Sequence, residues 1–111
     1  MAACICHVTT ASREEALAIA HTLVEERLAA GANILDGVTS LYWWRGHLEQ
    51  AAETMVVLKT RSELVPALTQ RVRQLHSYAC PCVVALPVSA GNPDYLGWIE
   101  SETRAPAAQP D

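Results

Sequence analysis

The sequence predicts one α+β domain whose main elements follow the order βαββαβ, with a short helix after them. Two stretches have apolar residues at the three- and four-residue spacing of amphipathic helices. The segments around these stretches are apolar or alternating and are bounded by glycine and proline, as strands are. A length of 111 residues fits a single domain with its own core, expected over residues 1–104, and residues 105–111 are expected to form a frayed tail.

The first strand is expected over residues 4–9, and a helix follows from Ser12. Ser12 and Glu15 have the spacing of a capping box, in which each side chain accepts a hydrogen bond from the backbone of the other. Gly31 is placed to end this helix. The apolar face expected for the helix is Leu17, Ala20, Val24 and Leu28.

Residues 32–60 read as two long antiparallel strands, with a bend or bulge at Asp36 and Gly37 and a turn at Arg45 and Gly46. The second helix is expected from about residue 62 to residue 76. It has a cap available from Ser62, or from Thr60 paired with Glu63. Its apolar face is Leu64, Leu68, Val72 and Leu75.

Residues 82–86 are expected to form the last strand because they are apolar and lie between two prolines. A turn at residues 91–94 and a short helix at 95–100 complete the predicted elements. The order is that of the ferredoxin-like, split βαβ fold, in which two helices cover one face of a four-stranded antiparallel sheet.

Two helices leave the other sheet face uncovered, so that face must be polar, bind something or pair with another subunit. The long central strands carry apolar candidates for it, which favours pairing and predicts a homo-oligomer. These candidates are Val38, Leu41, Val56 and Leu58.

Composition excludes several classes of function. Eight basic residues are scattered among twelve acidic ones, a net charge of −4, so nucleic acid is not an expected partner. No apolar run approaches the roughly twenty residues that cross a membrane, and the N-terminus lacks the pattern of a secretion signal. We therefore expect a cytoplasmic protein without a membrane partner. Without a glycine-rich phosphate loop, a Ser/His/Asp signature or a closed zinc motif, no enzyme activity is expected.

The four cysteines form two Cys-x-Cys pairs, Cys4 with Cys6 and Cys80 with Cys82. On a regular strand both sulfurs of a pair face the same side, and thiolates suit Cu(I) or zinc. The first and last strands are neighbours in this fold, which would bring the two pairs close together. The alternative, which we favour, is that the small apolar thiols fill the core.

Six segments have the residues, order and spacing of one known family. They are 25–30 (EERLAA), 37–46 (GVTSLYWWRG), 58–60 (LKT), 76–78 (HSY), 85–88 (ALPV) and 91–98 (GNPDYLGW). Over residues 5–101 the chain closely resembles the CutA divalent-ion tolerance family. The resemblance implies a homotrimer associated with tolerance to copper and other divalent metals. It also implies an architecture shared with PII-type signalling proteins, whose trimers bind small molecules in clefts between subunits.

The resemblance also points to ligands for a metal. In the family, the stretch matched by His76 and Tyr78 and the acidic position matched by Glu53 are metal or ligand loci. Together with the second cysteine pair, chosen for its thiol chemistry and not from the family, the candidate ligands for copper or another divalent metal are His76, Glu53, Cys80 and Cys82. For His76 the alternative is a hydrogen bond to the last carbonyls of its helix.

The aromatic triplet Tyr42-Trp43-Trp44 places its first and third side chains on one strand face and Trp43 on the other. Large aromatic residues anchor subunit interfaces, which is the favoured interpretation, and they also close ligand pockets. The second interpretation predicts a PII-like sensor of a small anionic ligand, and a third is a structural trimeric scaffold. The residues proposed for a ligand site or subunit cleft are Tyr42, Trp44, Lys59, Tyr78, Tyr95 and Trp98.

Overall fold

The computed structural model describes residues 2–105 and confirms the predicted element order. The elements are β1 (Ala3–Thr10), α1 (Arg13–Glu25), β2 (Gly31–Trp44), β3 (His47–Arg61), the single 3₁₀ turn η1 (Ser62–Leu64), α2 (Val65–Leu75), β4 (Val83–Pro87) and α3 (Pro93–Glu102). The strands form one antiparallel sheet in the order β2-β3-β1-β4. Except for Ala105, the predicted tail lies outside the described residues.

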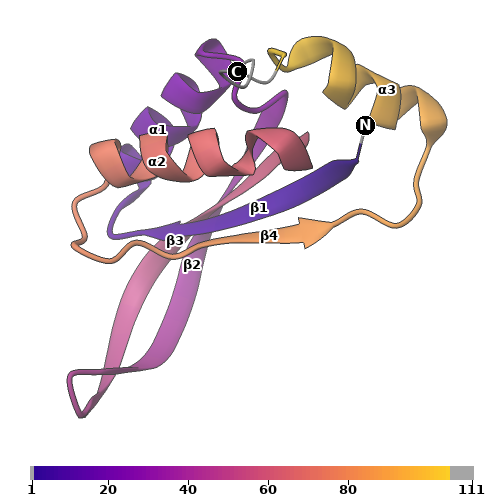
Figure 1. Cartoon of the computed structure of the whole chain (residues 1–111). Helices are drawn as coiled ribbons and strands as arrows, with labels where there is room; N and C mark the ends of the chain where they lie inside the picture. The colour runs from indigo at the N-terminus through magenta and orange to yellow at the C-terminus, as the bar shows by residue number, and fades with distance from the viewer. Residues whose placement is uncertain (1, 106–111) are drawn as a thin grey trace, which may run out of the picture.

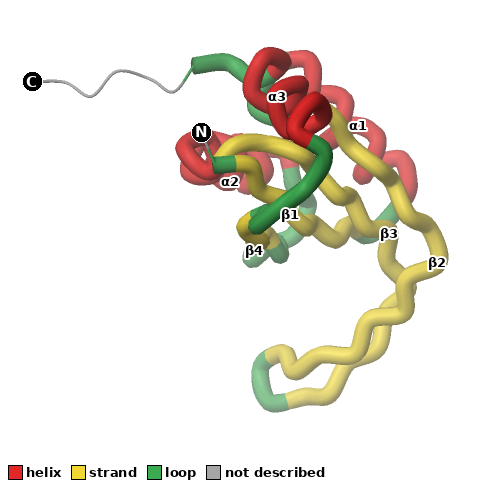
Figure 2. Tube along the Cα trace, turned by 90° about the vertical axis from the view of Figure 1, so that its right-hand side faces the viewer, coloured by secondary structure: helices red, strands yellow, loops and turns green. Residues whose placement is uncertain are grey.

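Helices α1 and α2 lie side by side over one face of the sheet, as predicted (Figure 1). The β2–β3 hairpin is much longer than the other strands and extends far beyond the helices (Figure 2). The core lies between the helices and the sheet. Its largest fully buried members are Ile19, Leu23, Leu28, Leu58, Leu64, Leu68 and Ile99. Across residues 2–105, none of the helices has the length and hydropathy needed to cross a membrane.

The start of α1 is the predicted cap. Ser12 Oγ accepts the Glu15 N–H at 3.2 Å, while Glu15 Oε1 accepts the N–H of Ala11 at 3.1 Å, one residue before the cap. The first bond satisfies a backbone donor of the first helical turn, as predicted, whereas the second binds the N–H of Ala11 in place of the Ser12 N–H that a capping box would bind.

The prediction that Gly31 ends this helix is wrong, because α1 stops at Glu25 and Gly31 opens β2. The helix ends in a Schellman motif: the Leu28 N–H donates to the Leu23 carbonyl at 2.9 Å, and the Arg27 N–H donates to the Val24 carbonyl at 3.0 Å. Arg27 takes the left-handed conformation with φ 60°. Burial of Leu23 and Leu28 in the core compensates for the missing glycine.

The apolar face of α1 is rotated from the predicted one. Leu17 is 46% exposed, whereas the buried residues are Ala16, Ile19, Ala20 and Leu23. Successive helical residues are about 100° apart. A face centred on Ala16, Ala20 and Leu23 therefore turns Leu17 toward the surface.

Three of the four candidates for the open sheet face were assigned to the wrong face, because Leu41 pairs with Gln50 and so shares the face of Val56 and Leu58, beyond the helices. Val56 and Leu58 are completely buried in the core, because β3 turns its even-numbered residues toward the helices. Odd- and even-numbered residues are both apolar over residues 55–58. Alternation alone therefore did not show which face of β3 is buried. The open face instead exposes Leu35, Val84 and Leu86.

The bulge predicted in β2 is present, because the pairing of β2 with β3 shifts between Leu35 and Val38. Gly37 at this point has φ +73°, a conformation that glycine adopts without strain.

The predicted caps of the second helix are not used, since no side chain caps η1 or α2. Thr60 Oγ1 instead donates to the Leu28 carbonyl at 2.7 Å, and Ser62 Oγ bonds to Glu63. The predicted apolar face is confirmed by the burial of Leu64, Leu68 and Val72.

Candidate functional site

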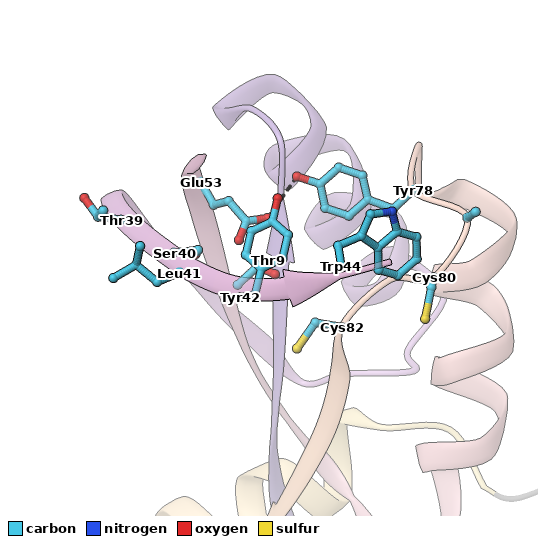
Figure 3. Close-up of a pocket in the computed structure, with 11 residues that line it drawn as sticks. Thr9, Thr39, Ser40, Leu41, Tyr42, Trp44, Glu53, Tyr78, Cys80 and Cys82 are labelled. Atoms are coloured by element: carbon cyan, nitrogen blue, oxygen red, sulfur yellow. Dashed lines mark hydrogen bonds between the residues drawn. The ribbon is translucent and has the colours of Figure 1, made fainter. Parts of the chain in front are cut away.

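A cavity of about 660 Å³ lies against the β2–β3 hairpin (Figure 3). Strand β1 ends at Thr10, which pairs with Thr54 of β3. Glu53, the next residue of β3 toward the hairpin turn, therefore has no partner on β1. The segment between α2 and β4 forms the facing wall. The lining residues are Thr9, Thr39, Ser40, Leu41, Tyr42, Trp44, Glu53, Tyr78, Ala79, Cys80 and Cys82.

The cavity brings together six residues that the sequence assigned to two different sites. Glu53, Cys80 and Cys82 come from the predicted metal set, and Tyr42, Trp44 and Tyr78 come from the predicted ligand set. Tyr42 and Trp44 share a face of β2, as alternation predicted.

Tyr78 is joined to Glu53 across the cavity. Its hydroxyl donates to Glu53 Oε2 at 2.9 Å (Figure 3). Burial raises the pKa of Tyr78 to about 12, with a further contribution from the hydrogen bond to the Glu53 carboxylate. Tyr78 therefore keeps its proton at physiological pH and fixes the orientation of Glu53.

His76 uses both ring nitrogens within the chain. Nδ1 accepts the backbone N–H of Tyr78 at 3.0 Å. Nε2 therefore carries the proton of the neutral ring and donates it to the Thr9 carbonyl at 2.8 Å. The ring also packs against Tyr78, with their centroids 4.6 Å apart. In this arrangement His76 has no lone pair free for a metal, and it holds Tyr78 in the cavity wall.

Glu15 supports the same segment from the start of α1. Its Oε2 accepts the backbone N–H of Ser77 at 2.8 Å, in addition to the bond from Ala11. Burial alone would raise the pKa of Glu15, but the hydrogen bonds from Ser77 and Ala11 outweigh it and lower the pKa. The capping box signalled the contact at the helix start. Nothing in the sequence signalled the contact with Ser77, which is 62 residues away.

The two cysteine pairs lie in different environments. Cys80 and Cys82 are exposed and precede β4, so the strand expected from residue 82 begins one residue later and contains neither cysteine. Cys4 and Cys6 are buried, and burial raises the pKa of Cys6 to about 12. The expected closeness of the pairs is wrong, because Cys6 pairs with Ala85, three residues beyond Cys82. Over residues 2–105, no three His, Cys, Asp or Glu side chains are grouped so as to hold a metal ion.

The other three predicted ligand residues do not line the cavity. Lys59 lies six residues further along β3 than Glu53, roughly 20 Å away at the rise of a strand, and its Nζ bonds to Asn33 Oδ1. Burial lowers the pKa of Lys59. Trp98 packs near Gly31, which pairs with Lys59, and its ring centroid is 5.3 Å from that of Tyr95. The predicted residues thus form two groups within one chain.

Comparison with known proteins gives consistent matches over nearly the whole chain. The family model for the CutA1 divalent ion tolerance protein matches residues 4–102. The divalent-cation tolerance protein CutA of Thermus thermophilus is 45% identical over 96 residues, which cover 86% of this chain and 93% of that protein. The chloroplastic protein CutA 1 of Oryza sativa is 40% identical over 100 residues, or 90% of this chain and 56% of that protein.

The solved structures agree with the sequence matches. The crystal structure of CutA1 from Oryza sativa superposes with a TM-score of 0.91 and 38% identity, covering 94% of this chain and 95% of that one. The chain spans about half the length of the curated relatives from rice and mouse. The residues that the family model matches include the hairpin and the segments that form the cavity. The chain belongs to the CutA1 divalent ion tolerance protein family.

Proposed function

We propose that this protein serves divalent-cation tolerance as a homotrimer that binds copper, or another metal, weakly. Membership of the CutA1 family carries the proposal. The proposed role is binding rather than catalysis. The chemistry that supports it within the chain is the pair of exposed thiols, Cys80 and Cys82, which line the same cavity as the Glu53 carboxylate.

Thiolates are soft ligands that favour Cu(I), and the carboxylate adds a harder donor. His76 would have to release Thr9 or Tyr78 before it could join them. Within residues 2–105 these three side chains are not grouped around one metal position, so a metal held by the thiols would need water or a group from a neighbouring subunit as further ligands, which accords with weak binding.

Trimer formation is supported by the sheet face that the helices leave open. It carries exposed apolar side chains on β2 and β4, among them Leu35, Val84 and Leu86. Covering such a face with copies of the same chain removes it from water, which stabilises the assembly.

The cytoplasm is the proposed location because the thiol ligands require a reducing compartment. A structural relative from Archaeoglobus fulgidus is described as periplasmic. Recovery of the protein in the cytoplasmic fraction of its own cells supports the proposal, and recovery in an exported fraction contradicts it.

Competition for Cu(I) with a chromophoric chelator, under anaerobic conditions, tests the metal proposal. The double variant Cys80→Ser, Cys82→Ser is expected to lose at least about tenfold in affinity, the equivalent of ~1.4 kcal/mol. His21→Ala, at an exposed position on α1, is the matched control and is expected to keep the affinity. If the double variant and the unmodified protein bind Cu(I) with equal affinity, the assignment of the thiols as ligands is wrong.

A second candidate function is a PII-like sensor of small molecules. The observation that favours it is the cavity itself, which has aromatic walls of Tyr42, Trp44 and Tyr78. Lys59, the expected contact for an anionic ligand, lies outside this cavity. A purely structural trimeric scaffold would leave tryptophan fluorescence unchanged by any small ligand.

A further inference from the structure

We propose that Asp36 and Gly37, at the bulge of β2, form a site of spontaneous modification. Asp36 isomerises there to isoaspartate, which frees the outer part of the β2–β3 hairpin from its fixed orientation. The inference goes beyond the proposed function, because it depends neither on metal binding nor on the number of copies in the assembly. Asp36 is the one aspartate or asparagine of the sequence that precedes a glycine.

The reaction is a ring closure followed by a hydrolysis. The backbone nitrogen of Gly37 attacks the carboxyl carbon of Asp36 in its uncharged acid form. A C–N bond forms, and the carboxyl hydroxyl leaves as water together with the amide proton. Water then opens the succinimide ring between its nitrogen and the main-chain carbonyl carbon of Asp36. The chain now continues through the side chain, and the former main-chain carbonyl is a carboxylate. The mass is unchanged, and no oxidant or reductant takes part.

The bulge leaves the backbone of Gly37 open to this attack. Leu35 pairs with Met55 and Val38 pairs with Glu53, so the register gives neither Asp36 nor Gly37 a partner residue on β3. A methyl group in place of a hydrogen of Gly37 would meet no atom within 4 Å. A side chain after the aspartate is the usual steric obstacle to ring closure, and glycine has none.

One exposed ion pair restrains the Asp36 side chain. Arg13 Nη1 donates to Asp36 Oδ2 at 2.7 Å, and the two side chains are 52% and 57% exposed. Ring closure requires the carboxyl group to turn from Arg13 toward its own backbone, so this pair must open first. Exposed ion pairs are weak, and opening one shifts an equilibrium by no more than about fivefold. The pair therefore delays the reaction and does not prevent it.

The carboxylate lies away from the sheet face on which the proposed subunit contacts are expected. Its partner Arg13 is the first residue of α1, and α1 covers the opposite face of the sheet (Figure 1). Packing of other copies against Val84 and Leu86 would therefore leave the ion pair on the helix side.

The bulge also determines which side chains of the hairpin share a face. Side chains alternate along a strand, yet Leu35 and Val38 face the same side, because the bulge contributes one extra residue. Isoaspartate adds a further atom to the backbone at this point. The faces and the register of residues 38–53 are then no longer fixed relative to the rest of the sheet.

Ageing the intact protein for several weeks at physiological temperature and neutral pH tests the first step. Methylation by an isoaspartyl methyltransferase counts the isoaspartate, and electron-transfer fragmentation of peptides places it in the sequence. We expect it to accumulate at Asp36 and not at Asp94, which precedes a tyrosine within α3. Its absence from Asp36 in the aged protein would overturn the proposal, whether or not a synthetic peptide of residues 31–41 forms it.

Three variants test the mechanism. Asp36→Glu keeps a carboxylate for Arg13 but would have to close a less favourable six-membered ring, so the accumulation is expected to disappear. Arg13→Ala removes the restraint and is expected to speed the accumulation by about two- to fivefold. Glu14→Ala, an exposed change at the next residue of α1, is the matched control and is expected to keep the original rate. Equal rates for Arg13→Ala and Glu14→Ala would contradict the restraining role of Arg13.

Amide hydrogen exchange tests the consequence for the hairpin. The isoaspartate form is separated from the fresh protein by chromatography under native conditions. Amides of residues 38–53 are expected to exchange at least about threefold faster in that form, whereas those of α1 and α2 keep their rates. Unchanged exchange over residues 38–53 would contradict the release of the hairpin.

Discussion

Burial divides the four cysteines into two chemical types. Desolvation disfavours a thiolate, so burial raises the pKa of Cys4 and brings that of Cys6 to about 12. Cys80 and Cys82 are exposed at the cavity. The thiolate is the reactive form of cysteine, so reactivity is expected to follow this division.

We expect a thiol reagent to label two cysteines in the native protein at neutral pH and all four after denaturation. Peptide mapping should place the native labels on Cys80 and Cys82, and Cu(I) added beforehand should protect them. The Cys80→Ser, Cys82→Ser double variant should take up no label while folded. Native labelling of Cys6 at a rate comparable to that of Cys82 would contradict the burial described above.

Glu15 ties the start of α1 to the wall of the cavity. Replacing it with alanine removes charge-assisted hydrogen bonds to Ser77 and Ala11, and we expect a loss of about 2 kcal/mol in the free energy of unfolding at pH 7. Urea denaturation measures this loss. Glu14→Ala, an exposed change in the same helical turn, is the control and is expected to cost less than about 0.5 kcal/mol.

The effect of Glu15 depends on pH in a defined direction. The pKa of Glu15 is lowered in the folded protein. Its contribution to the free energy of unfolding is therefore complete above the ordinary glutamate pKa of about 4.3, and it is lost as the pH falls through the pKa of the folded protein. The difference between the unmodified protein and Glu15→Ala should therefore shrink in acid. A difference that grows toward acid pH would show that the carboxylate does not carry these bonds.

The elements themselves were largely predictable from local patterns. Both long helices and the hairpin follow from apolar spacing, and the cap of α1 follows from Ser12 and Glu15. The end of α1 was not predictable, because a buried pair, Leu23 and Leu28, stabilises a left-handed arginine where glycine is usual. Which face of β3 is buried was also ambiguous, since its apolar residues stand at both odd and even positions.

Two leucines on α1 test the corrected helix face. Leu23 is fully buried, whereas Leu17, which periodicity placed in the core, is 46% exposed. We expect Leu23→Ala to lower the free energy of unfolding by about 2–5 kcal/mol because it leaves a cavity. Leu17→Ala should cost less than about 1 kcal/mol. Chemical denaturation of both variants decides between the two faces. Equal losses in the free energy of unfolding would support the face expected from the sequence.

The cavity is a property of the whole molecule, which is why the sequence did not predict its composition. It forms where the hairpin extends past the end of β1 and meets the segment that follows α2. Contacts that hold this wall join residues far apart in the chain, such as His76 to Thr9 and Tyr78 to Glu53. Hydrophobic periodicity and short motifs do not indicate such contacts. The sequence therefore identified several of the cavity residues but divided them between two sites.

The open sheet face is the second feature at this scale, and it connects the fold with the proposed trimer. Leu86 on β4 is 54% exposed on that face, whereas Leu17 is 46% exposed on α1, the helix that lies over the other face of the sheet (Figure 1). Leu86→Glu should shift the protein toward monomers, because burying a carboxylate at a subunit interface is costly. Leu17→Glu should leave the assembly intact and serves as the matched control.

Native mass spectrometry after anaerobic loading with Cu(I) tests the central claim most directly, because it reports assembly and retained metal together. The account predicts a species of three copies of the 12.0 kDa chain that carries copper, and loss of the copper in the Cys80→Ser, Cys82→Ser variant. A monomer alone, or a trimer that retains the same copper without these two thiols, would contradict it.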